Sequence, residues 1–242
     1  MALHFLVETS SDAEPGDLVS LTGAEAKHAA VVRRLRVGEQ VTIGDGRGVW
    51  LQGVAEEVAP ARVDVRISDR TVHPSPTPRI VLAQALAKGD RDELAVQAAC
   101  ELGVDEIVPW QASRSVSRWE GPKAVKGRER WATIVREAAK QAHRPWVPEV
   151  AAPASTGELA TRAGAERVLI LDPSATTRLS EITADDRDIV LVVGPEGGVS
   201  DDEIARLTAA GAERVLLGDT VLRTSTAGPA AIAVLSVALR RW

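Results

Sequence analysis

The sequence predicts an α/β protein in which a small amino-terminal β-barrel precedes a larger domain built on a parallel sheet. The first 70 residues contain short stretches with strand periodicity and tight-turn residues. Residues 73–78 then contain three prolines, which mark a domain boundary. Beyond them, near-continuous apolar runs alternate with helical stretches, as in a parallel sheet covered on both faces. We assign residues 1–72 to the barrel, 73–78 to a linker and 79–242 to the larger domain.

Each barrel element follows from local pattern. Strands are expected at residues 4–7, 17–21, 40–43, 49–58 and 62–68, with one helix near 23–35. Alternation is clearest in the last strand, where Val63, Val65 and Ile67 face one way. Residues 45–48, Asp-Gly-Arg-Gly, supply the turn of a hairpin.

The larger domain is expected to alternate strands and helices. Strands are expected at residues 80–86, 106–110, 167–171, 189–193 and 214–217, and helices near 90–102, 128–142, 155–163, 201–210 and 228–240. The last helix is apolar nearly all round, so it must be buried on two sides. We expect one side to face a second copy in a homodimer; the alternative is a central core helix.

Composition excludes several classes of protein. With 45% apolar and 26% charged residues, the 242-residue chain is neither disordered, collagenous nor a coiled coil. A single cysteine, Cys100, excludes an internal disulfide and a thiolate metal cluster, and the four scattered histidines predict no metal site. No apolar run reaches the roughly 18 to 20 residues of a membrane span, and residues 1–10 lack a secretory pattern. We therefore expect a cytoplasmic protein.

Positive charge is concentrated in two places although the net charge is −5. Residues 111–146 hold nine basic residues against three acidic ones, and a second cluster is Lys27, Arg33, Arg34 and Arg36. Such stripes are typical of proteins that bind a phosphate backbone. The alternative is that they are solvated helix faces.

Two loops are candidates for chemistry. Residues 194–198, Gly-Pro-Glu-Gly-Gly, follow a buried strand and let backbone approach a ligand closely. Glu196 and the acidic residues 201–203 favour a neutral or cationic ligand over a phosphate, and no dinucleotide fingerprint is present. In residues 216–229, hydroxyl residues are candidate N-caps, Pro229 suits a first helical turn, and Arg223 lies before the helix. Arg223 could hold an electron-rich group, or serve as a capping or salt-bridging arginine.

Together these loops resemble the RsmE family of 16S rRNA uridine N3-methyltransferases, of the SPOUT class. The similarity rests on residues 194–198 with Glu203, on Leu217-Gly218 and on Leu222-Arg223-Thr224-x-Thr226-Ala227. Further matching positions are Lys88, Gln97, 101–104, 114–116, 130–131, 137–139, Gln141, Arg144, Pro148, His28, 33–38 and 45–48. The resemblance covers essentially the whole chain.

The resemblance implies a trefoil-knotted methyltransferase domain, a PUA-like barrel, S-adenosylmethionine as cofactor, and 16S rRNA or the small ribosomal subunit as partner. The residues it places around the cofactor are Leu171, Gly194, Pro195, Glu196, Gly197, Gly198, Leu217, Gly218, Leu222, Arg223, Thr224 and Ala227. The family usually has Glu where this chain has Ser225, for which we infer a capping role. The motif that ends ribose-methylating relatives is absent, which favours base methylation.

Two residues are the candidate catalytic groups. Arg223 stays protonated, so it can stabilise a uracil anion but cannot serve as a base. Glu196 is the candidate base or sulfonium partner, and the sequence does not decide between these roles. The candidate RNA-binding residues are Arg33, Arg34, Arg36, Arg114, Arg118, Lys123, Lys126, Arg128 and Arg144. Trp131 is expected to pack, whereas Trp119 could pack or stack on a base.

Three alternatives stay open at this point. One is an RNA-binding pseudoenzyme, which only Ser225 supports. Another is a methyltransferase that acts at a different RNA position. A nucleotide-cofactor enzyme of the Rossmann type is disfavoured, because the glycine loop lies late in the chain.

Overall fold

The computed structural model describes residues 2–183 and 185–242 of the chain. These residues form two compact units. The first contains residues 2–75 and 139–147, and the second contains the described residues of 76–138 and 148–242. Residues 139–147, which the sequence analysis placed in the larger domain, therefore pack with the first unit.

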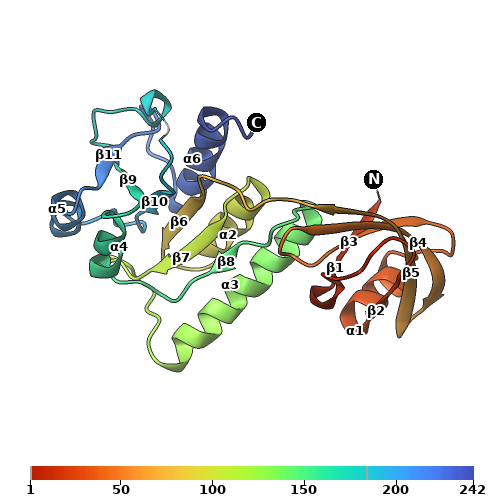
Figure 1. Ribbon diagram of the computed structural model, residues 1–242. Helices are drawn as coiled ribbons and strands as arrows, with labels where there is room; N and C mark the ends of the chain where they lie inside the picture. Colours follow the sequence, from red (N-terminus) through yellow and green to blue (C-terminus); the bar gives the residue numbers. More distant parts are fainter. Residues whose placement is uncertain (1, 184) are drawn as a thin grey trace. The chain divides into compact units, whose positions relative to one another are not determined.

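A five-stranded sheet forms the first unit (Figure 1). Its strands are β1 (Leu3–Leu6), β2 (Leu18–Thr22), β3 (Gln40–Gly44), β4 (Val49–Ala59) and β5 (Arg62–Val72). They lie in the order β1-β3-β4-β5-β2, and only β1 and β3 pair in parallel. Val63, Val65 and Ile67 are buried, as their alternation predicts. Asp64 is also buried, and hydrogen bonds from Ser20 Oγ and Arg62 Nε compensate for the burial of its carboxylate.

The helix of the first unit is shorter than predicted. Helix α1 (Gly23–Lys27) continues as a π-helical turn, His28–Val32, and Arg33 is its C-cap residue. Arg34 then takes a left-handed backbone conformation with φ 54°, which ends the helical path before residue 35.

The predicted hairpin turn between β3 and β4 is confirmed. Asp45 Oδ1 accepts hydrogen bonds from the backbone N–H groups of Arg47 and Val49. Gly48 has φ 106°, and a Cβ there would lie 2.6 Å from His73 O and 2.8 Å from the Trp146 ring. Only glycine fits this position.

The second unit is built on a six-stranded sheet in which every pair is parallel. The strands are β6 (Ile80–Ala85), β7 (Glu106–Trp110), β8 (Glu149–Val150), β9 (Arg167–Leu171), β10 (Ile189–Val193) and β11 (Glu213–Val215), in the order β11-β9-β10-β6-β7-β8. The predicted bounds of β7, β9 and β10 match the structure. The two-residue strand β8 was not predicted.

Helices cover both faces of this sheet, as the apolar strands predict. They are α2 (Arg91–Glu101), α3 (Pro122–Gln141), α4 (Thr156–Arg162), α5 (Asp201–Ala209) and α6 (Thr224–Ala238). Leu159 of α4 and Leu207 of α5 pack in one core with Val81, Val190 and other strand residues. On the opposite face α6 lies against β6 and β10, and α2 packs beside α6.

The start of α6 differs from the prediction. The helix begins at Thr224 rather than at residue 228, so Pro229 lies inside it instead of in a first turn, and that expectation was wrong. The N-cap residue is Arg223 rather than one of the hydroxyl residues. The reason is that the Thr224 hydroxyl is used elsewhere, as described below.

No helix among the described residues is long and apolar enough to cross a membrane. The α/β class with a parallel-sheet second unit is confirmed. The trefoil knot that the resemblance implies stays a prediction.

Candidate functional site

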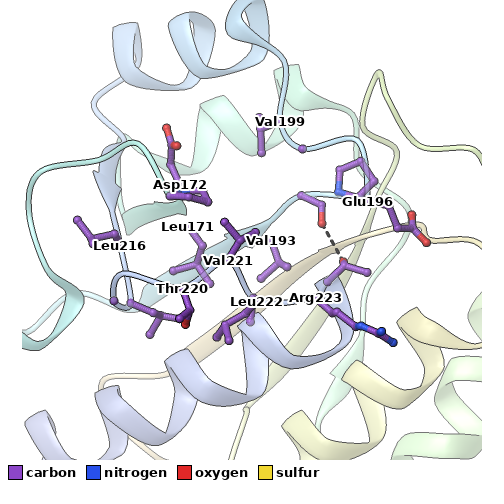
Figure 2. A pocket seen from close by; sticks show the side chains of 18 of the residues that line it. Leu171, Asp172, Val193, Glu196, Val199, Leu216, Thr220, Val221, Leu222 and Arg223 are labelled. Atoms are coloured by element: carbon purple, nitrogen blue, oxygen red, sulfur yellow. Dashed lines mark hydrogen bonds between the residues drawn. The ribbon is translucent and has the colours of Figure 1, made fainter.

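A cavity of about 480 Å³ opens at the carboxyl ends of β9, β10 and β11 (Figure 2). Because parallel strands end at the same edge of a sheet, loops that are far apart in the sequence meet there. The volume lies within the roughly 300 to 1,000 Å³ of small-molecule sites. The lining residues are Arg91, Leu171, Asp172, Pro173, Val193, Gly194, Pro195, Glu196, Gly198, Val199, Ile204, Leu216, Leu217, Gly218, Thr220, Val221, Leu222, Arg223, Thr224 and Ala227.

The walls of the cavity are mainly apolar side chains and bare backbone. The apolar side chains include Leu171, Val193, Leu216 and Val221. A Cβ added to Gly218 would meet no atom within 4 Å, so the backbone there borders open space. Such walls suit a flat, largely apolar ring system held between side chains.

A buried hydrogen-bonded chain joins the two loops of the cavity. Gln84 of β6 is fully buried, and its Nε2 donates to Thr224 Oγ1 at 2.9 Å. The Thr224 hydroxyl in turn donates to the Gly194 carbonyl at 2.8 Å, the bond drawn in Figure 2. One hydroxyl therefore ties the start of α6 to the glycine loop after β10.

Glu196 is held as a carboxylate. Its Oε1 accepts hydrogen bonds from Arg91 Nη1 at 2.7 Å and from the Lys88 backbone N–H at 3.1 Å. Burial opposes ionisation, but backbone N–H groups and Arg91 outweigh it and lower the pKa of Glu196. A carboxylate with a lowered pKa is a weak base and a favourable neighbour for a cation.

Arg223 has a free guanidinium at the amino end of α6. Figure 2 shows its side chain at the same end of the cavity as Glu196, away from Asp172. The residue is exposed, and among the described residues its side chain has no hydrogen bond or ion pair. Arg223 is the N-cap residue of α6 by its backbone position, but among the described residues its side chain forms neither a capping hydrogen bond nor a salt bridge. The positive helix terminus and the guanidinium together favour an electron-rich group at this position.

Asp172 marks the other end of the cavity. Its carboxylate accepts hydrogen bonds from Ser174 N–H at 2.8 Å and from Arg214 Nε at 2.7 Å. Burial raises the pKa of Asp172, but the bonds from Ser174 and Arg214 outweigh it, so the net pKa is lowered. The paired carboxylate fixes the loop that follows β9.

Glu203 holds the residues that follow the glycine loop through hydrogen bonds. It lies in the capping box that opens α5, and it also accepts hydrogen bonds from Ser113 N–H at 2.8 Å and Thr156 Oγ1 at 2.9 Å. Burial opposes its ionisation, but the bonds from Ser113 and Ser200 lower its pKa overall. Arg114 adds a second clamp, because its Nη1 donates to Gly197 O at 3.1 Å.

The chain matches two family models. One, described as an RNA methyltransferase domain, covers residues 73–236, and the other, described as an RNA methyltransferase PUA domain, covers residues 21–68. The ribosomal RNA small subunit methyltransferase E of Mycobacterium bovis is 42% identical over 248 residues, across 100% of this chain and 94% of that protein. The protein of the same name from Bacillus subtilis is 30% identical, across 98% of this chain and 96% of that protein.

The chain belongs to the RsmE family of RNA methyltransferases. Its structure is similar to that of the Neisseria gonorrhoeae ribosomal RNA small subunit methyltransferase E bound to S-adenosylmethionine, with TM-score 0.88, 30% identity and 98% coverage of each chain. It is also similar to a Legionella pneumophila methyltransferase in complex with the same cofactor, with TM-score 0.86, 32% identity and coverage of 98% and 97%. The family and the PUA-like first domain predicted from the sequence are confirmed.

Most residues that the RsmE resemblance places around the cofactor line this one cavity. The exception is Gly197, whose carbonyl faces Arg114 instead. The lining residues that sequence reasoning missed are Arg91, Asp172, Pro173, Val193, Val199, Ile204, Leu216, Thr220 and Val221. Asp172 could have been found, because it directly follows a predicted strand as the two chosen loops do. Gln84 and Arg91 carry no local signal.

Ser225, at which this chain departs from the usual RsmE pattern, lies in the first turn of α6 behind the N-cap residue Arg223. The capping role inferred for it was therefore wrong. The position is half-buried and follows the Thr224 tie directly.

The predicted RNA-binding residues fall into separate groups in this RsmE chain. Arg33, Arg34 and Arg36 are exposed in the first unit, to which Arg144 also belongs, and Lys123 and Lys126 are exposed near the start of α3. Arg114, Arg118 and Arg128 instead donate to backbone carbonyls of Gly197, Ser113 and Val150. These three bonds use part of the donor capacity that RNA phosphates would need.

The two tryptophans near these charges pack together. Trp131 is 1% exposed, so its predicted packing role is confirmed. Trp119 meets Trp131 edge to face with 5.0 Å between ring centroids, and its ring covers Gly127. A Cβ at Gly127 would lie 2.5 Å from that ring.

Proposed function

We propose that this chain transfers a methyl group from S-adenosylmethionine to N3 of a uridine in 16S ribosomal RNA. Support comes from its full-length similarity to proteins named ribosomal RNA small subunit methyltransferase E. Two similar structures hold this cofactor. The observation that carries the proposal is the cavity itself, which brings the glycine loop, the loop after β11 and Arg223 together.

The cavity residues fit the cofactor. Leu171, Val193 and Leu216 offer apolar surface for the adenine ring, and the open backbone at Gly218 leaves room beside it. The Glu196 carboxylate and the Gly194 carbonyl favour the positive sulfonium. Bound here, the cofactor supplies an electrophilic methyl carbon.

In this proposal Arg223 stabilises the negative charge that develops on the uracil. Methylation at N3 removes a weakly acidic proton, so the enzyme must favour the uracil imide anion. The free guanidinium of Arg223 stabilises negative charge on a uracil oxygen and lowers the pKa of the bound imide. The proton then passes to solvent. Glu196, with its lowered pKa and its bond to Arg91, positions the loop and the cation and is a poor proton acceptor.

RNA methylation mapping tests the proposal. The purified chain is incubated with methyl-labelled S-adenosylmethionine and small ribosomal subunits, or naked 16S rRNA, from cells that lack the gene. Mass spectrometry is expected to find one new methyl group at N3 of a single uridine. A methyl group on a ribose oxygen, or at another base position, would contradict it. Calorimetry that detects no cofactor binding would favour an RNA-binding pseudoenzyme instead.

We further propose that the enzyme acts as a homodimer in the cytoplasm, where ribosomal subunits are assembled. In the single chain Ala231, Ile232 and Leu235 of α6 are buried, whereas Val237 is 63% exposed. Val221, at the rim of the cavity, is 77% exposed. A second copy that covered these two side chains would remove apolar surface from water. Light scattering is expected to give twice the chain mass, and Val237→Asp to give monomers.

A further inference from the structure

The first unit contains a small cavity of its own, remote in sequence from the methyl-transfer site. Its volume is about 180 Å³. The side chains that give it its chemistry are His4, His28, Arg33, Lys140 and His143, all within the first unit. No aspartate or glutamate lines it among the described residues. Arg33 and Lys140 are cations and the three histidines offer ring nitrogens, so these five side chains favour an anion.

Two helix ends bring these side chains together. His28 opens the π-helical turn, and Arg33 closes it, with the Arg33 N–H donating to the His28 carbonyl at 2.9 Å. Lys140 lies in the last turn of α3, and His143 follows that helix in a left-handed conformation with φ 54°. The cavity is therefore held by secondary structure on both sides.

His4 forms the inner wall. Its ring stacks on Trp50 with 4.2 Å between centroids, and its Nδ1 is 2.9 Å from Thr42 Oγ1. Its Nε2 is buried without a hydrogen-bond partner among the described residues. Burial, and then the charges of His143 and Lys140, lower the pKa of His4 from 6.5 to about 3. Burial is the larger of these causes, so the inner wall is a neutral imidazole.

Neighbouring groups leave this positive potential only partly balanced. Lys140 Nζ lies 3.1 Å from Glu25 Oε1, a pair that offsets one charge. The Arg33 side chain is exposed and has no ion pair among the described residues. Across the same part of the chain, no group of three or more His, Cys, Asp or Glu is placed to hold a metal ion, so a cation is not the fitting ligand.

We propose that this cavity binds one phosphodiester of the RNA substrate, held by the Arg33 guanidinium and by the ring N–H groups of His28 and His143. A free phosphate ion has similar chemistry, but we propose that the ligand is a phosphodiester of the RNA backbone. This inference rests on the proposed function only in that RNA is the substrate. It adds to the exposed arginines a built pocket that fixes the register of the strand.

RNA affinity without cofactor tests the inference. A short fluorescein-labelled single-stranded RNA is titrated by anisotropy at several salt concentrations. Arg33→Gln is expected to weaken binding roughly ten-fold or more and to reduce the salt slope by about 0.7. The matched control Lys27→Gln removes an exposed cation of α1 that does not line the cavity, and is expected to have a clearly smaller effect. Equal losses in the two variants would overturn the proposal.

A second variant controls for misfolding, and an NMR measurement distinguishes RNA from free phosphate as the ligand. His143→Asn keeps a residue type that tolerates positive φ, so the fold is retained while the ring donor is lost. It is expected to weaken RNA binding several-fold with unchanged thermal unfolding. The ¹⁵N resonances of His28 and His143 are expected to shift with RNA, and not with inorganic phosphate at matched ionic strength. Shifts with phosphate alone would assign the cavity to the free ion and overturn the RNA proposal.

The outcomes of this test and of the proposed function can be told apart. If the parent protein neither binds S-adenosylmethionine nor methylates a base, the proposed function is contradicted, independently of the result for the small cavity. A parent enzyme that methylates RNA, with Arg33→Gln and His143→Asn binding RNA as tightly as the parent, would sink the cavity proposal alone.

Discussion

Thr224 gives the most direct test of how the cofactor site is held. Thr224→Val keeps the shape of the side chain but removes the hydroxyl that joins Gln84 and the Gly194 carbonyl at 2.9 and 2.8 Å. The residue is 7% exposed, so water does not readily replace those bonds. Two hydrogen bonds at about 1 kcal/mol each give a cost of about 2 kcal/mol. If the whole of this free energy is lost from cofactor binding, the affinity for S-adenosylmethionine drops about 30-fold.

Calorimetry with S-adenosylmethionine measures the change in affinity, and chemical denaturation measures the change in the free energy of unfolding. The matched control Thr224→Ser retains the hydroxyl and is expected to bind within a few-fold of the parent. Gln84→Met should weaken binding less when Thr224→Val is already present, because both act on one chain of bonds. Equal affinities for the Val variant and the parent, or fully additive effects, would refute the reasoning.

Three further predictions concern the reaction, the fold and pH. Arg223→Gln is expected to lower the single-turnover methylation rate by about 10²-fold, because it removes the charge facing the uracil anion; an unchanged rate would remove Arg223 from the mechanism. Glu203→Gln is expected to reduce the free energy of unfolding by about 1 to 3 kcal/mol, whereas the exposed neighbour Asp202→Asn should change it by less than about 0.5 kcal/mol in denaturant titrations. The pKa of His4 is about 3 in the folded protein, against an ordinary value of 6.5. The unfolded chain therefore takes up the proton first, so the free energy of unfolding is unaffected by this group above pH 6.5 and falls as the pH drops toward 3. Between pH 7 and pH 5 the loss is about 2 kcal/mol, and His4→Gln should abolish that difference; an identical pH dependence would contradict the assignment.

The strands of the second unit were predictable because burial on both faces leaves an unambiguous signal. Ile189–Val193 is an uninterrupted apolar run, and its bounds agree with β10. The strand β8 has only two residues and depends on pairing with β7, so its own sequence shows no strand periodicity. The start of α6 was misplaced because local pattern cannot tell whether a threonine caps its own helix or, as Thr224 does, bonds a distant carbonyl.

The site was predictable to the extent that its chemistry lies in loops directly after strands. The glycine loop and Arg223 could be found in that way. Gln84 could not, because one polar residue within an apolar strand acquires its role only through a partner 140 positions away. Arg114 and Arg128 were grouped with the RNA-binding residues on charge alone, since a sequence does not reveal that a guanidinium already donates to a neighbouring carbonyl.

The Thr224 hydroxyl has a consequence for how the walls of the cavity move relative to one another. Because it joins the glycine loop to the start of α6, those two walls separate only when its bond to the Gly194 carbonyl breaks. Residues 217–222 form the remaining wall, and among the described residues they make no backbone hydrogen bond, only the exposed ion pair of Asp219 with Arg178. A segment so loosely fastened opens at the lowest free energy. We therefore expect the backbone amides of residues 217–222 to exchange with solvent faster than those of the other two walls.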